Sequence, residues 1–538
     1  MTPIGQVGEL RVNTKFKVCI LSAGKGIRLG SLTKTLNKSL LPIDEKAVIS
    51  HIIEKFSSEV EIVVAVGHQG EKVKEYISHA HSDRNITSIS VDNFDGEGSG
   101  PGYSLLCCRD HLKCPFIIYA ADTIVTEEIP PPTKNWLGVA EVSETKPFCT
   151  VELRDGFITA LADKKECDNR FAFVGVAGVH SYDEFWRALE NDSSLINNEH
   201  QISNGLNVLI SHNLQPERFS WFDTGTVENY NGTKSHFEGD DDRFNFSKIN
   251  EFTYFVNGRV IKYFDDSDII DKRFKRSKFL DGLCPPIDRK TNWFMSYEKI
   301  KGNTIYECLT PRVAKSFFKW SQDHLWSGDK VPQDFSESCR QFYKDKTEKR
   351  LQALSIKYPM YRNTKVSVNG EELPTIDELL KMVDWDELST GTAVNFHGDL
   401  QFDNVLKTGW LSSGRDDFKL LDWRQDFAGQ VEVGDLYYDL AKLYGGMTLP
   451  YHFIKRNRFH YQEDTTGVSY DFHTTSMISE SKEEFEEFVR NSGYDMQRIR
   501  LIRALIFLNM SPLHEYPFDK MLFHMSRFYL WRILKDED

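Results

Sequence analysis

One segment limits the fold of this chain more than any other, because it reads as a buried strand that runs directly into a glycine loop: KVCILSAGKG, residues 17–26. A helical pattern follows at 50–56, and a second apolar strand follows at 61–68. Further apolar runs lie at 116–122 and 173–180, with an amphipathic helical stretch after them. We therefore expect an α/β fold, with a mostly parallel, helix-flanked, Rossmann-like sheet over the first ~230 residues.

The length of 538 residues is too great for one hydrophobic core, so several compact units are expected. A short acidic run at Glu238–Asp242 interrupts the apolar pattern and marks the predicted break. Beyond it, Asn257-Gly258 lies between two β-branched and aromatic runs, which predicts a hairpin. The chain then becomes mostly helical. The predicted organisation is an N-terminal tail at 1–14, an α/β domain at 15–239, a small β-rich lobe at 240–312 and a large helical lobe at 313–538.

Charge and cysteine usage exclude several classes of protein. The formal net charge of −14 disfavours a dedicated nucleic-acid binder. The nine cysteines form no C-x-x-C pair and no zinc-spaced cluster, which favours reduced thiols in a cytoplasmic protein. No apolar run of signal-peptide length opens the chain, and the most apolar later stretch, Leu501–Met510, is interrupted by Arg503. We expect a cytoplasmic protein without membrane insertion.

The glycine loop itself excludes two common nucleotide motifs. A dinucleotide fingerprint would need a glycine at position 29, where Leu29 stands, and the next glycine is Gly30. The pattern G-x-x-x-x-G-K-[ST] of P-loop proteins does not occur in the sequence. Glycines after a strand nevertheless let backbone N–H groups approach phosphate oxygens closely, so phosphate binding is the expected task of this loop.

The stretch LSAGKGIRLGSLTKTLNKSLLPI, residues 21–43, resembles the signature of the sugar-phosphate nucleotidyltransferases (GT-A-like NTP transferases). The resemblance implies that Arg28 and Lys38 act as catalytic cations on the transferring triphosphate. Asn37 departs from the family, which usually has proline there. The resemblance also implies a nucleotide-binding surface formed by Leu21, Ala23, Gly24, Gly26 and, in the later loop GSGPGYS, Gly100.

Two later carboxylates strengthen this resemblance. Asp122 ends the apolar run FIIYAAD, and Asp223 lies in SWFDTGT, which is similar to the W-x-D-T-G-T segment of the family. The resemblance implies that the two hold Mg²⁺, an ion that prefers oxygen ligands. It further implies that Lys164 binds a sugar phosphate, with the adjacent Lys165 as the alternative. Substrate contacts are implied for two more residues, Gly175 and Glu199.

A second group of polar residues lies in the helical half. Phosphoryl transfer to a hydroxyl requires a carboxylate near the acceptor proton, an Asn that helps to hold Mg²⁺, and a second carboxylate that joins the metal to the phosphates. The string NFHGDLQFDNV places Asp399 and Asn404 in this order, and Asp422 follows in KLLDWRQDF. We interpret Asp399 as the catalytic base and Asn404 and Asp422 as metal ligands, and we give His397 a structural role.

This set resembles the aminoglycoside phosphotransferase and choline kinase superfamily, and GDLYYDLA at 434–441 matches its usual continuation. The resemblance implies a bilobal, protein-kinase-like α+β domain in which Lys262, on the strand after the Asn257-Gly258 turn, binds the nucleotide phosphates. Two elements depart from the family. The helix expected to supply a glutamate partner for Lys262 has none, so an aspartate such as Asp271 would replace it, and no glycine loop covers the phosphates.

Together, the two resemblances predict a bifunctional kinase and nucleotidyltransferase that uses Mg²⁺ in both domains. ATP would phosphorylate a small acceptor, favoured as a sugar at its anomeric hydroxyl, and a second NTP, CTP or UTP, would then give an NDP-linked product and pyrophosphate, for surface polysaccharide or glycoconjugate synthesis. One alternative is a choline or amino-alcohol kinase joined to a phosphocholine-type cytidylyltransferase. A second is an active nucleotidyltransferase with a silent, regulatory kinase-like domain. The sequence leaves homo-oligomer formation open.

Overall fold

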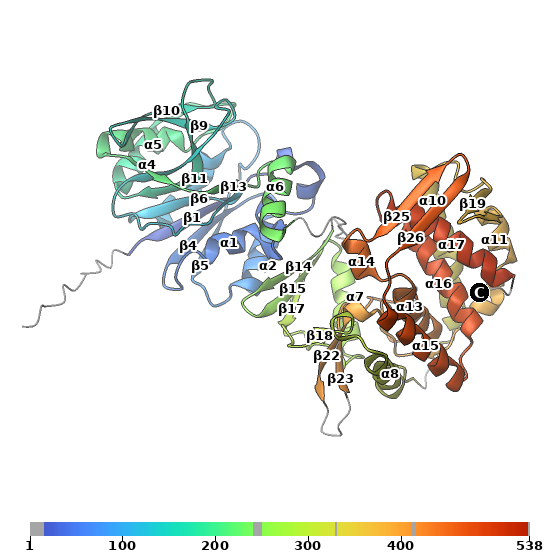
Figure 1. Ribbon diagram of the computed structural model, residues 1–538. Coiled ribbons are helices and arrows are strands. Elements are labelled where there is room, and N and C mark those ends of the chain that lie inside the picture. Colours follow the sequence, from blue (N-terminus) through green and yellow to red (C-terminus); the bar gives the residue numbers. More distant parts are fainter. Residues whose placement is uncertain (1–14, 240–249, 329–330, 411–415, 536–538) are drawn as a thin grey trace, which may run out of the picture. The chain divides into compact units, whose positions relative to one another are not determined.

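The computed structural model describes residues 15–239, 250–328, 331–410 and 416–535. The chain divides into two compact units (Figure 1). The first takes residues 15–239 together with 250–265, and the second takes the described residues from 266 onward. The acidic run expected to mark the domain break falls largely at 240–242, outside the described residues.

A nine-stranded sheet forms the centre of the first unit, and its middle is parallel. Four neighbouring strands run in one direction because each follows a crossover that returns the chain to the same edge. In three of these strands the apolar side chains are buried on both faces, as expected for parallel strands covered by helices, whereas the side chains of the outermost strand, Ile86–Ser90, are only partly buried. In spatial order these strands are β6 (Phe116–Ala120), β1 (Lys17–Ser22), β4 (Glu61–Val66) and β5 (Ile86–Ser90).

The remaining strands add antiparallel pairs around this parallel centre, so the sheet is mixed. Strand β11 (Phe171–Val179) lies antiparallel to β6 and pairs with two further strands. An apolar run has the same pattern in either direction, so the sequence could not show this reversal. The other added strands are β8 (Trp136–Glu141), β9 (Cys149–Arg154), β10 (Phe157–Asp163) and β12 (Gln215–Arg218).

Helices and short strands complete the first unit. Helix α4 buries Phe185, Trp186 and Leu189 against the sheet, as its amphipathic pattern predicted. The short strand β13 (Trp221–Asp223) pairs with β7 (Thr123–Val125) and so brings two distant segments together. The helices are α1 (Val48–Ile53), α2 (Gly70–Ala80), α3 (Pro101–Cys107), α4 (Tyr182–Asn191), α5 (Ser203–Leu209) and α6 (Val227–Glu238), and a further short pair is β2 (Pro42–Ile43) with β3 (Lys46–Ala47).

The hairpin predicted at Asn257-Gly258 is present as β14 (Glu251–Val256) and β15 (Arg259–Phe264). Both turn residues have positive φ angles, 51° and 73°, which fits the Asn-Gly preference of tight hairpins. The hairpin is part of the first unit and packs against its remainder: Tyr254 donates a 2.7 Å hydrogen bond to the Leu40 carbonyl. Lys72 forms a 2.7 Å ion pair with Asp265 just beyond the hairpin. The assignment of this hairpin to a kinase small lobe stays a prediction.

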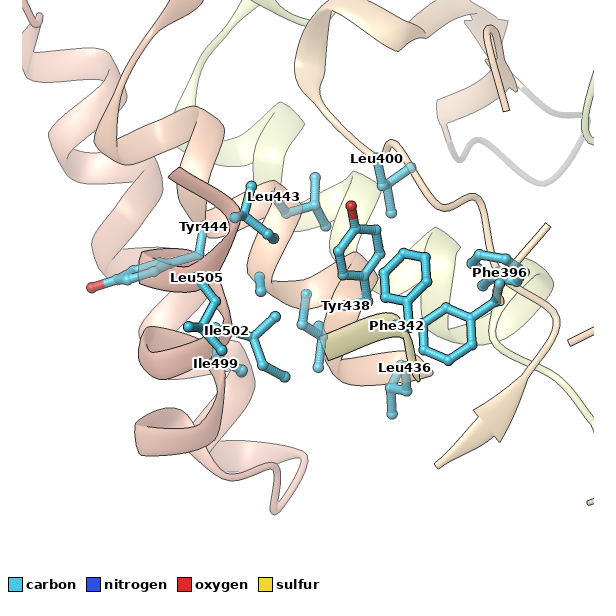
Figure 2. Close-up of a cluster of buried hydrophobic side chains, with 14 of the residues drawn as sticks. Phe342, Phe396, Leu400, Leu436, Tyr438, Leu443, Tyr444, Ile499, Ile502 and Leu505 are labelled. Carbon is cyan, nitrogen blue, oxygen red and sulfur yellow. The ribbon is translucent and has the colours of Figure 1, made fainter. Parts of the chain in front are cut away.

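Helices dominate the second unit. Helices α13 (Leu436–Thr448) and α16 (Met496–Met510) pack together and bury Leu443, Tyr444, Ile502 and Leu505 (Figure 2). Burial on nearly all sides explains why α16 has so little polar surface. The other helices are α7 (Ser267–Ser277), α8 (Pro311–Trp320), α9 (Phe335–Arg340), α10 (Lys346–Lys357), α11 (Ile376–Met382), α12 (Trp385–Leu388), α14 (Tyr451–Lys455), α15 (Ser476–Asn491) and α17 (Phe518–Leu534).

Short sheets connect these helices. The antiparallel pair β22 and β23 leads into the segment that contains Asp422. The strands of this unit are β16 (Arg289–Lys290), β17 (Phe294–Glu298), β18 (Asn303–Thr304), β19 (Val366–Val368), β20 (Glu371–Leu373), β21 (Ala393–Val394), β22 (Val405–Trp410), β23 (Asp416–Leu420), β24 (Gly434–Asp435), β25 (Phe459–Asp464) and β26 (Gly467–Phe472). Among the residues that the structure describes, no helix is both long enough and apolar enough to cross a membrane.

Candidate active sites

The glycine loop of the first unit follows β1 and opens onto a cavity of about 770 Å³. Gly26 adopts a left-handed backbone conformation (φ 64°, ψ 40°), and the Thr33 hydroxyl donates a 3.0 Å hydrogen bond to its carbonyl. A Cβ at Gly24 would meet nothing within 4 Å, so the loop backbone faces open space there. The loop thus offers phosphate oxygens a close approach to the backbone.

Lys38 is held by the residue that departs from the family pattern. Asn37 is buried, and its side-chain oxygen accepts a hydrogen bond from the Ser39 amide and caps the turn that begins at Lys38. Its side-chain amide donates to the carbonyls of Ser22 and His68, at 2.8 and 2.7 Å. Asn37 therefore ties the lysine turn to the end of β1 by side-chain hydrogen bonds that a proline could not make.

Lys38 forms an ion pair with Asp122, with 2.6 Å between Nζ and Oδ2. Burial alone would raise the pKa of Asp122. The charge and hydrogen bond of Lys38, together with the charge of Arg28, outweigh burial and hold this pKa below its ordinary value. Asp122 is therefore a carboxylate at neutral pH, positioned between two cations.

Asp223 lies beside Asp122 because β13 pairs with the strand that follows Asp122. Its two oxygens accept hydrogen bonds from the Gly225 amide (2.8 Å) and the Asn229 side chain (2.5 Å). Burial and the negative charge of Asp122 nevertheless raise the pKa of Asp223. Asn229 is a residue that the sequence analysis missed, and its only signal is its place on the helix that follows Thr226.

The two carboxylates and Arg28 surround one small space. A Cβ placed on Gly225 would lie 3.0 Å from Asp223 Oδ1, 3.2 Å from Arg28 Nη2 and 3.3 Å from Asp122 Oδ2. Like charges at such separations repel, and a hard divalent cation between the oxygens would remove that repulsion. The donor set fits Mg²⁺, which the resemblance implied for Asp122 and Asp223.

The residues expected to contact the acceptor line the same cavity. Lys164 Nζ lies 3.3 Å from Glu199 Oε2, and Gln201 donates a 2.8 Å hydrogen bond to that oxygen. Lys165 does not line the cavity, whereas Lys164 does. The structure thus brings together every residue predicted for the first site: Leu21, Ala23, Gly24, Gly26, Arg28, Lys38, Gly100, Asp122, Lys164, Gly175, Glu199 and Asp223.

In the second unit, Asp399 is surrounded by partners that keep it ionised. Lys442 Nζ lies 2.6 Å from Asp399 Oδ1, and Gln401 donates to the same oxygen at 3.0 Å. Burial would raise the pKa of Asp399, but the charge of Lys442 holds it well below the ordinary range. The Asn404 side-chain amide donates a 2.8 Å hydrogen bond to the Asp399 carbonyl, so its oxygen stays available as an acceptor. The sequence analysis missed Lys442, which lies three residues after Asp439.

Asp439 holds the loop that carries Asp399. Its carboxylate accepts 2.7 Å hydrogen bonds from the amides of His397 and Gly398, and a third from Trp326. His397 Nε2 donates to the Leu421 carbonyl while Nδ1 accepts from the Asp399 amide. Both ring nitrogens are thus engaged, as expected for a structural histidine, and burial lowers the pKa of His397 to about 4.

Asp422 has a positive φ of 56°, which is rare for a residue other than glycine and is typical of functional turns. The amide of the preceding Leu421 donates to the Asn404 carbonyl at 2.8 Å, and this bond places Asp422 next to Asn404. The two residues are therefore neighbours in the fold, and their side-chain oxygens are of the chemical type that Mg²⁺ prefers.

Lys262 lies buried on β15, in the hairpin that forms part of the first unit. Asp271, considered as a substitute partner for it, forms an ion pair with Lys290 at 2.5 Å. The role of Lys262 in binding nucleotide stays a prediction.

The comparisons with known proteins concern the first unit. Residues 18–130 match the family described as the MobA-like NTP transferase domain. The bifunctional protein GlmU of Methanococcus maripaludis is 27% identical over 227 residues, which cover 40% of this chain and 53% of that protein. The low-salt glycan biosynthesis nucleotidyltransferase Agl11 of Haloferax volcanii is 25% identical over 173 residues, 30% of this chain and 48% of that protein. A solved UDP-glucose pyrophosphorylase aligns with 41% of this chain and 98% of its own, at 18% identity and a TM-score of 0.37.

The chain thus carries an N-terminal NTP transferase domain, and this part of the prediction is confirmed. It spans about half the length of the curated relatives that it matches. The kinase-like interpretation of the second unit stays a prediction.

Proposed function

We propose that the first unit transfers a nucleotidyl group from an NTP to a phosphorylated small molecule. The observation that carries this proposal is the single cavity in which the glycine loop, Arg28, Lys38 and the two carboxylates meet. Fixed cations that line a cavity beside a glycine loop are what a charged transition state requires.

In the proposed reaction, a phosphate oxygen of the acceptor attacks the α-phosphorus of the NTP. The bond from that phosphorus to the bridging oxygen breaks, and pyrophosphate leaves with the electron pair. Lys38 and Arg28 stabilise the charge that develops on the phosphoryl oxygens. Asp122 and Asp223 would hold Mg²⁺, which when bound neutralises charge on the triphosphate.

The favoured acceptor is a sugar phosphate. The name of the Haloferax relative, a glycan biosynthesis nucleotidyltransferase, supports this class. Lys164 lies in the cavity, where it pairs with Glu199 at 3.3 Å, a length typical of a loose ion pair. An incoming phosphate would therefore find this lysine within the cavity and weakly held.

We propose further that the second unit makes this phosphate ester by transferring the γ-phosphoryl group of ATP. The acceptor hydroxyl oxygen would attack the γ-phosphorus, its proton would pass to Asp399, and ADP would leave. The support is geometric: Lys442 and Gln401 orient Asp399, and Asn404 and Asp422 lie beside it. The second NTP, CTP or UTP, would then react in the first unit.

Product analysis of the full chain tests both steps. Wild-type protein receives ATP, each of the four NTPs and a panel of sugars and amino alcohols, and the product mass and pyrophosphate are recorded. Asp399→Asn should form no NDP-linked product from the free acceptor, yet recover when the phosphorylated acceptor is supplied. Asp223→Asn should accumulate phosphorylated acceptor and stop there. Failure of the supplied phosphate ester to rescue Asp399→Asn would show that the two sites share no intermediate.

A further inference from the structure

Three cationic side chains without a role in the proposed reaction form a cluster next to the loop that carries Asp399. Lys346 and Arg350 are one turn apart on α10, so they share one face of that helix. Arg424 reaches the same region from the loop after β23, and its stem packs against Gly398, the residue before Asp399. Lys346 Nζ lies 4.0 Å and Arg424 Cζ 5.0 Å from the centre of the Phe342 ring, so the two cations are within 9 Å of each other.

These cations have no carboxylate partner among the residues that the structure describes. The Arg424 side chain donates to the Asp426 carbonyl at 3.0 Å, and Lys346 contacts the rings of Phe342 and Tyr438. Asp399, whose negative charge acts on Lys346, is already paired with Lys442. In a chain with a net charge of −14, such an excess of positive charge needs an explanation.

The charges also repel one another. Burial, then the positive charges of Arg424, Arg350 and Lys442, lower the pKa of Lys346 well below its ordinary value. Burial and Arg424 likewise lower the pKa of Arg350. The positive charges therefore destabilise one another, and a bound anion would relieve this repulsion. This arrangement is typical of a binding site and unusual for a purely structural feature.

An aromatic floor lies beneath the cations. The rings of Phe342 and Tyr438 meet edge to face at 4.8 Å, and Figure 2 shows them together beside Leu400, the residue after Asp399. Both rings are nearly buried, so they support the cations from beneath and leave the positive charges to contact a negatively charged ligand.

We propose that Lys346, Arg350 and Arg424 bind the acceptor of the second unit, and that this acceptor is an alcohol carrying a carboxylate or a phosphate, such as a sugar acid. This inference rests on the kinase activity proposed above. Its substrate class differs from the amino alcohols of the choline kinase alternative, because a cationic head group would be repelled here. The anion would fix the molecule so that its hydroxyl reaches Asp399.

The test compares acceptors that share a skeleton and differ in charge. The full chain with ATP is offered D-glucuronate against D-glucose, D-glycerate and sn-glycerol 3-phosphate against glycerol, and choline. ADP release and product mass are the readouts. Comparison of the carboxylates, D-glucuronate and D-glycerate, with the phosphate ester, sn-glycerol 3-phosphate, shows which anionic group the site prefers. Lys346→Gln and Arg350→Gln should each raise the KM for the anionic acceptor about tenfold and leave the KM for ATP within about twofold. Lys349→Gln is the matched control, because Lys349 is exposed on the same helix.

Each outcome decides one proposal. If only neutral or cationic acceptors are phosphorylated, the proposal of an anionic acceptor is overturned, whereas the proposal that the second unit is a kinase stands. A rise in the KM for ATP in both variants would overturn it as well, because the cluster would then bind the nucleotide. If no acceptor is phosphorylated, the kinase proposal fails. Calorimetric titration of the full chain with D-glucuronate and with sn-glycerol 3-phosphate then tests the anion site separately. Binding that Lys346→Gln abolishes supports the anion site, and absence of binding overturns it.

Discussion

Replacing Gly225 by alanine tests whether the space between the two carboxylates of the first unit is the reactive centre. The backbone of Gly225 does not have a positive φ, so alanine brings no conformational strain. Its methyl group would lie 3.0–3.3 Å from oxygens of Asp223 and Asp122 and from the Arg28 guanidinium. Such contacts are shorter than ordinary van der Waals contact, so these groups must each move by a few tenths of an ångström.

The size of the effect follows from that displacement. A misplacement of about 1 Å in a catalytic site costs ~100-fold in rate, so a few tenths should cost about threefold to tenfold, or about 0.7–1.4 kcal/mol in the activation barrier. Stability should change by less than about 2 kcal/mol, because the overpacking is offset by the lower entropy of the unfolded alanine chain. Half-maximal activity should also require more Mg²⁺.

The assay is pyrophosphate release from an NTP and a phosphorylated acceptor, measured over a range of Mg²⁺ concentrations. Gly232→Ala is the control, since its Cβ on α6 would meet nothing within 4 Å. Its activity should equal that of the wild type. Unchanged turnover by a folded Gly225→Ala protein at every Mg²⁺ concentration would refute the placement of the reactive centre.

Two further changes probe the same unit. Gly175→Ala should destabilise the fold by roughly 2 kcal/mol or more, because φ is 87° and the new Cβ would lie 2.7 Å from Ala120 Cβ. Gly156→Ala is the control in thermal melts, because Gly156 has a similar φ of 81° but open space around it, so it shows the cost of backbone strain without crowding. Equal losses of stability in the two variants would contradict the crowding argument. Lys38→Met should lower the rate of pyrophosphate release by at least about 100-fold, because it removes the cation and its 2.6 Å contact with Asp122. Lys34→Met is the control, because Lys34 is exposed, and its rate should not fall. Similar losses in the two variants would show that the effect of Lys38→Met is indirect.

The residues proposed for the first site could be picked out of the sequence because each one carries a local signal. A glycine after a strand, a lysine ten residues beyond Arg28 and an aspartate at the end of an apolar run are all visible in one dimension. The cavity collects them because β13 pairs with β7 and because parallel strands end at the same edge. Asn229 could not be predicted in this way, since its contact with Asp223 depends on how α6 begins.

The residues that support Asp399 were harder to predict for a related reason. Lys442 and Asp439 are 43 and 40 positions away, and only the path of α13 brings them to the loop. The cationic cluster joins α10 to a loop some 75 residues later, and no sequence pattern marks such a contact. The direction of β11 was invisible for a different reason, because burial on both faces gives the same pattern in either direction.

Asp439 gives a pH-dependent prediction for the second unit. Burial raises its pKa from 3.8 to about 6, against the opposing influence of three hydrogen-bond donors and the charge of Arg276. The folded state therefore binds a proton more tightly than the unfolded state does. The stability associated with this group is fully present below about pH 4 and is lost as the pH rises through 6, a total of about 3 kcal/mol.

Asp439→Asn isolates this effect, because asparagine is neutral at every pH and nearly the same shape. Other groups, including His397, whose pKa burial lowers to about 4, titrate in both proteins and so cancel in the difference. Relative to the wild type, the variant should gain about 2 kcal/mol between pH 4 and pH 7 in urea unfolding followed by tryptophan fluorescence. A difference in stability that stays constant across this range would mean that the donors from His397, Gly398 and Trp326 keep Asp439 ionised throughout, and that burial does not govern this carboxylate.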